Sequence, residues 1–479
     1  MSVIKNFEAF VSCLNCSIDV INAFFEKFFF FKIYGFPFLL LLVLIAFILS
    51  NFVFKFVSIR LLLHTWDIIR DKFTAPNDPG TISHTQAVYT EALSTLGLGS
   101  VAGVAIAIAM AGPGAILWLI VAGLLGMSTK FAEVTLGHKY RVFNKSGTIN
   151  GGPFLYIKKG LSEIGYPKIG IVIGTIYAFT MILASVGTST IFQTNQTVMM
   201  LAEDMHVKSF PLLPIIMVVT PVVVIVLFKL DKIAKIADTV IPFMTIFYVL
   251  ASILVLLMHY KNILPSFALI WHDAFNPASI QGGITGSIVV GFARAMYATT
   301  SGSGTSAIAH APSKTSEHVR EGCAAFIDVL LALLMCLMTG MVVIVTGVYS
   351  KHGVDCERGI AIAKEAFSTV HPYFSKTLTI AVFLLALTTV IGWSYYGSMA
   401  WMYLFGEQTV FIYKIIFVLF TIYAAIAGNA SGILKLCDHI WTIVMVPNLL
   451  TVFLLAKPIR HDIKSYIDRW KKGLFHVYK

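Results

Sequence analysis

The chain has 479 residues, of which 57% are hydrophobic and only 12% are charged. Soluble domains carry about 25% charged residues, so this composition excludes an ordinary soluble protein and indicates one embedded in a membrane. The formal net charge of +11 would suit a nucleic-acid-binding domain, but the basic residues lie between apolar segments, which argues against that role.

The first 35 residues mix phenylalanine with lysine, and this pattern predicts an amphipathic segment at the membrane interface over residues 1–35. About 20 apolar residues span a bilayer. By that measure the sequence predicts eleven transmembrane helices, at 36–57, 88–110, 113–136, 169–201, 211–229, 237–258, 284–309, 323–348, 376–405, 410–428 and 436–456. Four regions follow: a leading helix and loop (36–87), two five-helix units (88–258 and 259–456) and a basic tail (457–479).

Basic residues gather in the loops after the first, third and fifth predicted spans and in the C-terminal tail. Lys130 is counted with the basic loop that follows the span at 113–136. The positive-inside rule then places these loops and the C-terminus in the cytoplasm and the N-terminus outside. The loop between 348 and 376 is also basic and argues against this orientation.

Two predicted spans contain glycine-rich runs, Gly97–Ser100 in 88–110 and Gly302–Thr305 in 284–309. Glycine costs about 1 kcal/mol in a helix interior, and irregular backbone at membrane depth is tolerated only beside a cavity or a buried site. Each run lies in the first span of a set of five. Because five is an odd number of crossings, the second set crosses the membrane in the opposite direction. This pattern predicts an inverted repeat with a broken helix leading each half and a substrate site at mid-depth. The alternative is a small-residue packing face on two continuous helices.

A broken helix exposes N–H groups that bind anions and carbonyl groups that bind cations, so the two breaks suit an amino acid and an alkali cation. Thr388 and Thr389 could give hydroxyl oxygens to the cation or bond back to their own helix. Trp393 could line the pocket or simply pack. Gln193, a polar amide at bilayer depth, requires a partner, either the substrate or another helix. Arg294 is either a gate residue or a cation that extends to the outer interface.

His138, His310 and His371 lie near the ends of predicted spans, where a histidine is either structural or part of a proton relay. The sequence contains no HExxH, GxSxG or Walker motif, so neither an enzyme nor an ATP-driven pump is expected.

The run from Gly97 to Arg141, GLGSVAGVAIAIAMAGPGAILWLIVAGLLGMSTKFAEVTLGHKYR, resembles the signature region of the alanine or glycine:cation symporters. Further similar motifs lie in order within residues 85–457: Gly151-Gly152-Pro153, Ala307-Ile308-Ala309-His310-Ala311, Thr388 to Gly397 and Pro447-Asn448-Leu449. The resemblance implies an all-α, polytopic, leucine-transporter-like fold, a five-plus-five inverted repeat with one extra N-terminal helix. It also implies sodium coupling.

The resemblance places the substrate between the two breaks, at positions matching Thr95, Gly97, Leu98, Gly99, Gln193, Met296, Tyr297, Thr299 and Trp393. It implies a sodium site built from the carbonyls of Leu93 and Leu96 and the hydroxyls of Thr388 and Thr389. No cofactor is expected beyond the coupling ion, and the expected partners are a neutral amino acid, sodium or a proton, and the lipid bilayer.

The sequence departs from the family pattern at both breaks. The family's GTGN is here Gly97–Ser100, and the Asn-Glu pair of its SNEAGLGSAP motif is here Thr299-Thr300. The hypothesis is therefore an inner-membrane symporter that moves a small neutral amino acid such as alanine or glycine with sodium, by alternating access. Four alternatives stay open: proton coupling or another amino acid on the same fold, a substrate sensor, a channel, and a membrane-embedded enzyme.

Overall fold

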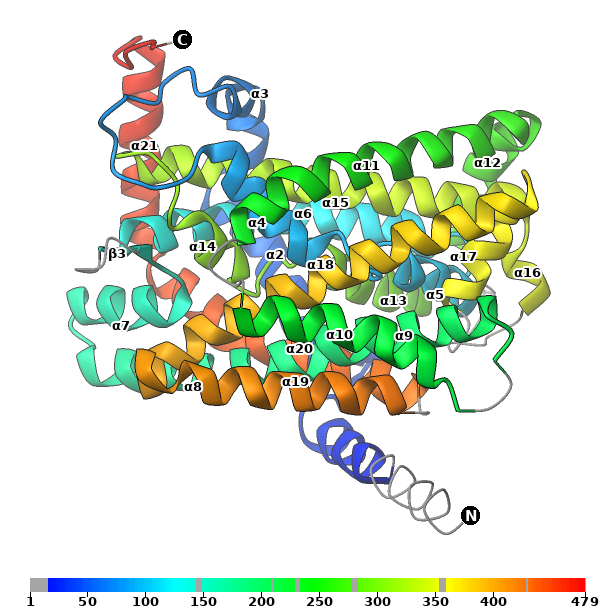
Figure 1. Ribbon diagram of the computed structural model, residues 1–479. Helices are drawn as coiled ribbons and strands as arrows, with labels where there is room; N and C mark the ends of the chain where they lie inside the picture. The colour runs from blue at the N-terminus through cyan, green and yellow to red at the C-terminus, as the bar shows by residue number, and fades with distance from the viewer. Residues whose placement is uncertain are drawn as a thin grey trace.

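The computed structural model describes residues 16–143, 149–207, 210–228, 233–276, 283–352, 359–427 and 430–478. Most helices run side by side in one bundle, and the C-terminal helix stands at one end of it (Figure 1). The described strands are two short hairpins, β1 (Lys32–Ile33) with β2 (Phe36–Pro37) and β3 (Val142–Phe143) with β4 (Ile149–Asn150). The predicted all-α class is therefore confirmed.

The chain enters the bundle through α2 (Phe38–Val53), which turns by 73° into α3 (Val57–Ile69). Two successive residues, Lys55 and Phe56, take left-handed backbone angles (φ 54° and 52°) at this turn. The first repeat then comprises α4 (His84–Thr95), α5 (Ala102–Ala111), α6 (Ala115–Lys139), α7 (Pro153–Glu163), α8 (Pro167–Ala184), the π-helical turn η1 (Ser185–Ser189), α9 (Thr190–Asp204), α10 (Leu212–Phe228) and α11 (Ile233–Met258).

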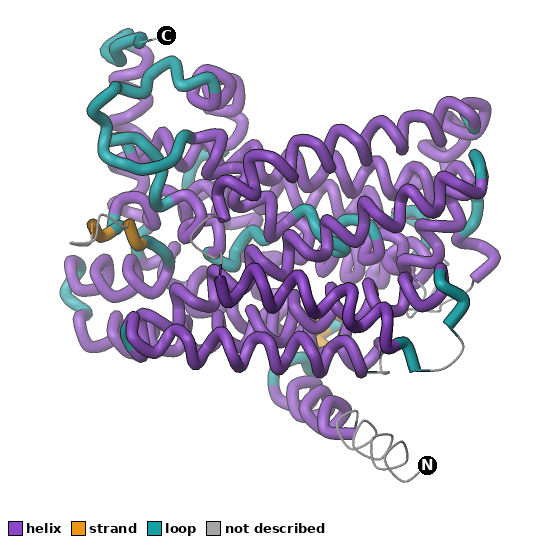
Figure 2. The backbone as a smooth tube through the Cα atoms, viewed as in Figure 1, coloured by secondary structure: helices purple, strands orange, loops and turns teal. Residues whose placement is uncertain are grey.

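The second repeat follows η3 (Tyr260–Asn262) and α12 (Ile263–Ala274). It comprises α13 (Gly283–Thr299), α14 (Thr305–His310), α15 (His318–Thr346), α16 (Tyr349–His352), α17 (Gly359–Ser368), α18 (Pro372–Phe405), η5 (Glu407–Thr409), α19 (Val410–Ile426) and α20 (Ala430–Leu454). The chain ends in α21 (Ala456–Lys471). Loop segments lie inside the bundle as well as at its ends (Figure 2), which is unusual for a helical membrane protein.

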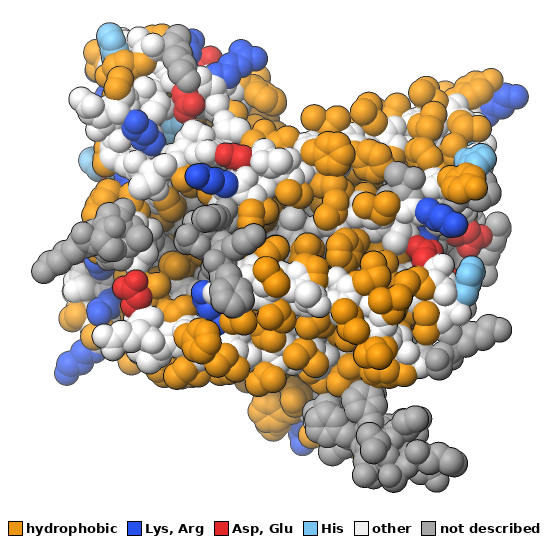
Figure 3. Space-filling model, in the orientation of Figure 1, with side chains coloured by type: hydrophobic (Ala, Val, Ile, Leu, Met, Phe, Trp, Pro, Cys, Tyr) orange, Lys and Arg blue, Asp and Glu red, His pale blue; other side chains and the backbone are white. Residues whose placement is uncertain are grey.

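Within the described residues, seven helices are long and apolar enough to cross a membrane, and the bent pair α2–α3 makes up to eight. The two interrupted helices, α4–α5 and α13–α14, and the 17-residue α10 account for the other three of the eleven predicted spans. Hydrophobic side chains cover the middle of the face seen in Figure 3, and charged side chains gather toward the two ends of the bundle. The protein is a multi-pass membrane protein.

Small residues allow the central helices to approach closely, as is common where lipid gives no hydrophobic drive for association. A Cβ on Gly291 of α13 would lie 2.8 Å from the Cβ of Trp118 on α6, and one on Gly340 of α15 would lie 2.8 Å from Ile116. Helix α6 therefore packs tightly against α15 and against α13, the first half of the second broken helix.

The basic tail is a helix rather than a solvated strand of chain. Ile459, Ile463 and Ile467 of α21 are buried, one helical turn apart. The tail is tied to α3 by a 2.8 Å hydrogen bond between the Tyr466 hydroxyl and His64 Nε2. The end of the bundle that carries α21 is called the tail end below.

Candidate functional site

The span predicted at 88–110 is broken over residues 96–101, between α4 and α5. Glycine is required there because neighbouring helices press against the backbone. A Cβ on Gly97 would lie 2.8 Å from Gln193 Nε2 and 3.1 Å from the Thr389 Cβ. Both distances are shorter than ordinary van der Waals contact, so any larger residue at position 97 must shift the Gln193 or Thr389 side chain.

Gln193 is the polar partner of this first break. Its Oε1 accepts a 2.9 Å hydrogen bond from the Leu98 N–H, and its side chain is buried. The π-helical turn Ser185–Ser189 lies just before it, between α8 and α9. Such turns widen a helix by one residue and occur frequently at functional sites.

Two carbonyl groups at the end of α4 lack backbone donors. Among the described residues, no backbone N–H of the break donates to the carbonyl oxygen of Leu93 or Leu96. On α18, the hydroxyls of Thr388 and Thr389 both donate to the Leu385 carbonyl, at 2.9 Å each. A hydroxyl that donates once keeps lone pairs for a cation, so this back-bonding is compatible with an ion site. The four oxygen atoms have the chemistry that a hard cation requires.

The second predicted span, 284–309, is also broken, between α13 and α14. Thr300, Gly302 and Gly304 have positive φ angles of 53°, 89° and 81°. A threonine with φ above zero is uncommon because its branched side chain crowds the backbone. Both breaks are therefore present, and the alternative of two continuous helices with small-residue faces is wrong.

The carbonyl groups of this second break are bound by side chains from three other helices. Thr299 accepts from Lys130 Nζ at 2.7 Å, Gly302 from Asn448 Nδ2 at 2.8 Å and Ser303 from the Tyr177 hydroxyl at 2.7 Å. Each partner replaces a hydrogen bond that a continuous helix would have made. The second break is thus held in place by α6, α8 and α20.

A buried ion pair joins the tail-end half of the first broken helix to the second break. Glu91 of α4 and Lys130 of α6 lie 3.1 Å apart, and both side chains are fully buried. Glu91 Oε1 also accepts hydrogen bonds from Thr300 Oγ1 and Ser306 Oγ, both at 2.7 Å, and the Tyr396 hydroxyl donates to Oε2 at 2.5 Å. The assignment of Lys130 to a basic loop is wrong, because its ammonium group is inside the bundle.

Aromatic side chains cover the breaks on the other side. A Cβ on Gly99 would lie 2.6 Å from the Tyr297 ring. Trp441 of α20 packs against Trp393 and Tyr297, with ring centroids 4.9 and 5.8 Å apart, and its Nε1 donates to the Met296 carbonyl at 3.1 Å. The indole of Trp393 donates to the Ser94 carbonyl at 3.3 Å.

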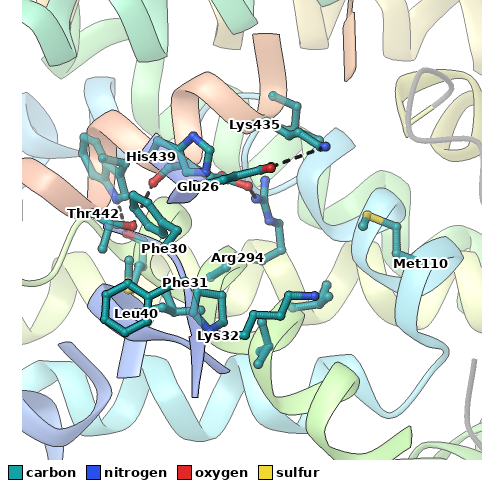
Figure 4. A pocket seen from close by; sticks show the side chains of 18 residues that line it. Glu26, Phe30, Phe31, Lys32, Leu40, Met110, Arg294, Lys435, His439 and Thr442 are labelled. Atoms are coloured by element: carbon teal, nitrogen blue, oxygen red, sulfur yellow. Dashed lines mark hydrogen bonds and ion pairs between the residues drawn. The ribbon is translucent and has the colours of Figure 1, made fainter. Parts of the chain in front are cut away.

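A cavity of about 540 Å³ lies next to this aromatic layer (Figure 4). It is bordered by Met296 and Arg294 of α13, by Trp441 and Asp438 of α20, and by the N-terminal segment. Arg294 forms an ion pair with Asp438, and only 5% of the arginine is exposed. The arginine is thus paired inside the protein, and a role as a gate residue stays a prediction.

The structure therefore brings together Gly97, Leu98, Gln193 and Thr389 at the first break. It also brings Gly99, Met296, Tyr297 and Trp393 against one aromatic layer. Thr95 and Thr299 are the last residues of α4 and α13, and their hydroxyls bond to the preceding turn, to Glu91 O at 3.2 Å and Ala295 O at 2.9 Å. No contact between Thr388 and α4 is recorded among the described side-chain hydrogen bonds.

Sequence reasoning missed Glu91, Asp438 and Trp441. Glu91 and Asp438 lie in predicted apolar spans, and an ionisable residue inside such a span is a functional-site signal by itself. That signal was available for both. Nothing in the local sequence of Trp441 distinguishes it from a packing residue.

The family model of the sodium:alanine symporter family matches residues 19–479. The sodium/alanine symporter AgcS of Methanococcus maripaludis is 30% identical over 432 residues, covering 90% of this chain and 94% of that protein. The probable sodium/glutamine symporter GlnT of Bacillus subtilis is 27% identical, and the alignment covers 92% of this chain and 90% of that protein.

A solved structure, the crystal structure of MhsT in complex with L-phenylalanine, aligns with a TM-score of 0.54 at 14% identity. The alignment covers 79% of this chain and 99% of that one. At this identity the likeness concerns the fold alone, and it confirms the expected leucine-transporter-like five-plus-five architecture.

Proposed function

Because this chain belongs to the sodium:alanine symporter family, we propose that it moves a small neutral amino acid together with sodium by alternating access. The observation that carries the proposal is the first break. There, Gly97 lies against Gln193 and against Thr389 of α18, and among the described residues the Leu93 and Leu96 carbonyls receive no backbone donor. Family membership supports cation-coupled amino acid symport, and the choice of amino acid and ion is the finer part of the proposal.

Sodium is proposed to bind between the carbonyls of Leu93 and Leu96 and the hydroxyls of Thr388 and Thr389. An ion held there would join α4 to α18 and would order the break, so that the substrate binds to an arranged site. This gives the coupling its physical basis, since the ion and the substrate each favour the same arrangement of the break.

The substrate is proposed to be alanine or glycine, lying against Gly97, Leu98 and Gly99 with Gln193 and Trp393 nearby. The close approach of Tyr297 to Gly99 and of Thr389 to Gly97 supports a small side chain. Thr95, Met296 and Thr299 would complete the site at the ends of α4 and α13. The tail end would face the cytoplasm of a plasma (inner) membrane, with the N-terminus outside.

The test is uptake of radiolabelled amino acids into proteoliposomes under an inward sodium gradient, an inward proton gradient, or neither. Alanine or glycine should accumulate only with the sodium gradient. Accumulation driven by the proton gradient alone would show that the proton, and not sodium, is the coupling ion. If every amino acid crosses the membrane at a rate that does not depend on either gradient, symport is refuted. Saturable binding without flux would favour a sensor.

A further inference from the structure

A second group of buried ionisable side chains lies between the breaks and the tail end and has no role in the proposed sites. His310 ends α14, and Glu321 and Asp328 lie on α15, with all three side chains fully buried. The two nitrogen atoms of the His310 ring face different carboxylates. Nδ1 lies 2.5 Å from Glu321 Oε1, and Nε2 lies 3.0 Å from Asp328 Oδ2.

This geometry requires one more proton than neutral histidine carries. A neutral imidazole has one N–H donor, so its second nitrogen would present a lone pair to an ionised carboxylate. One of the two carboxylates would then face a ring lone pair instead of an N–H within a low-dielectric interior, where such an unfavourable polar contact is costly. An extra proton, on the ring or on a carboxyl group, turns both contacts into hydrogen bonds.

The same group holds the first residue of α4. His84 Nδ1 lies 2.5 Å from Glu321 Oε2, and the His84 side chain is fully buried. Since α4 is the tail-end half of the first broken helix, Glu321 links that half to α14 and α15. The group therefore connects both broken helices to one neighbouring helix.

Other charged or titratable side chains surround the group from each packed element. Lys130 of α6 lies 4.0 Å from Asp328 Oδ2 and also contacts Glu91 of α4, which the Tyr396 hydroxyl of α18 reaches. His138 and Arg141, at the end of α6, and Arg320 and Cys323 of α15 lie within electrostatic reach of Glu321 or of its neighbours. Lys130 is already shared between several acceptors, so it cannot by itself neutralise the two carboxylates of the triad.

We propose that Glu321, His310 and Asp328 form a proton-binding site, occupied while α4 packs against α14 and α15 and emptied when α4 moves away from them. When α4 moves away, water reaches the group and can solvate both carboxylates, so the extra proton is no longer required. Opening at the tail end is thus linked to proton release and is favoured by higher pH. This inference goes beyond the proposed symport of sodium and an amino acid.

The first test measures the proton itself and needs no transport. In Asp328→Asn the amide can donate to His310 Nε2, so the ring stays neutral and no extra proton is required. A histidine in an unfolded chain loses its proton near pH 6.5, so between about pH 7 and 9 the folded wild-type protein binds one proton more than the unfolded chain. The apparent melting temperature of the wild-type protein in detergent should therefore fall as the pH rises. For each unit of pH, the unfolding equilibrium constant of the wild-type protein should rise by a factor about ten times larger than that of Asp328→Asn.

The matched control is Asp67→Asn, which removes an exposed carboxylate paired with Lys72 and should keep the wild-type slope. Glu321→Gln is a second variant, should Asp328→Asn not fold, and is expected to flatten the slope as well. Equal pH slopes in the wild-type protein and in a folded triad variant would overturn the proposal.

The second test measures the link to opening and rests on the proposed function. Exchange of labelled substrate across proteoliposomes, with equal pH on both sides, should rise from pH 6.5 to 8.5 in the wild-type protein and stay flat in Asp328→Asn. A flat wild-type profile would overturn the link. Absence of exchange at every pH would instead refute the symport proposal and leave the melting result standing.

Discussion

The two broken helices differ in how their backbone groups are used. In the second break, the carbonyls of Thr299, Gly302 and Ser303 accept hydrogen bonds from side chains of other helices. In the first break, the carbonyls of Leu93 and Leu96 accept no hydrogen bond from a backbone N–H among the described residues. The Gln193 side chain accepts a hydrogen bond from the Leu98 N–H. The carbonyl groups of the second break are thus paired within the protein, whereas among the described residues the first break retains carbonyl groups without backbone donors.

This contrast indicates how a pseudo-symmetric fold can divide its work. A break whose polar groups are satisfied internally fixes the geometry around it, because each side-chain donor restrains the backbone. A break with unused carbonyls is completed only when a ligand arrives. We therefore expect substitutions at the second break to affect stability first, and substitutions at the first break to affect ion and substrate binding first.

The largest effect is expected for Lys130→Met at the second break. It leaves the Glu91 carboxylate buried without its cation, and breaking a buried pair in this way costs about 3–5 kcal/mol. The measurement is thermal or denaturant-induced unfolding of the purified protein. The double variant Glu91→Gln/Lys130→Met, which removes both charges, should regain part of the loss. Wild-type stability in Lys130→Met would show that the second break does not depend on this pair.

Gly97→Ala tests the first break. Its methyl group would overlap Thr389 Oγ1 and Gln193 Nε2, and a displacement of about 1 Å at a reacting or binding site can cost about 100-fold in rate. Sodium-driven uptake should fall by about that factor while the melting temperature changes little. Gly103→Ala on α5 is the matched control, because its Cβ would meet atoms only at an ordinary 3.7 Å. Equal uptake in the two variants would contradict the crowding argument.

Thr389→Ala removes one proposed sodium ligand. Apparent sodium affinity should drop by about tenfold, equivalent to about 1.4 kcal/mol, with a smaller change in substrate affinity at saturating sodium. Uptake measured over a range of sodium concentrations gives both values. Ser398→Ala is the control, because that hydroxyl bonds within the same helix, to Ser394 O at 2.7 Å. Unchanged sodium dependence in Thr389→Ala would remove this residue from the ion site.

The smallest effect is expected for Trp441→Phe. The variant keeps the aromatic packing and loses one hydrogen bond to the Met296 carbonyl, worth about 1 kcal/mol. Apparent substrate affinity should weaken by no more than about fivefold. A larger loss would mean that the indole contributes more to the substrate site than its packing and this hydrogen bond.

Most of the architecture could be predicted from the sequence, because hydrophobic length and glycine placement are local signals. Both breaks lie where Gly97–Ser100 and Gly302–Thr305 predict them. The proximity of Gln193 to Leu98 was implied by family resemblance and is present in the structure.

The charged network could not be predicted, because it depends on which helix faces meet. Lys130 lies near a basic loop in sequence, and only the packing of α6 against the second break shows that its ammonium group is buried. Thr300 occupies the position of a glutamate in the family motif, and the carboxylate at this break comes instead from Glu91, over 200 positions earlier in the chain. A contact between residues so far apart in the chain leaves no periodic signal in the sequence.

The wide turn at Ser185–Ser189 controls where the Gln193 amide points. Each residue advances an α-helix by about 100°, so the one extra residue of this turn rotates everything beyond it by roughly that angle relative to a regular helix. The orientation of the amide therefore depends on the number of residues in the turn that precedes it. Shortening that turn by one position would swing Gln193 off the first break while leaving every binding residue chemically unchanged.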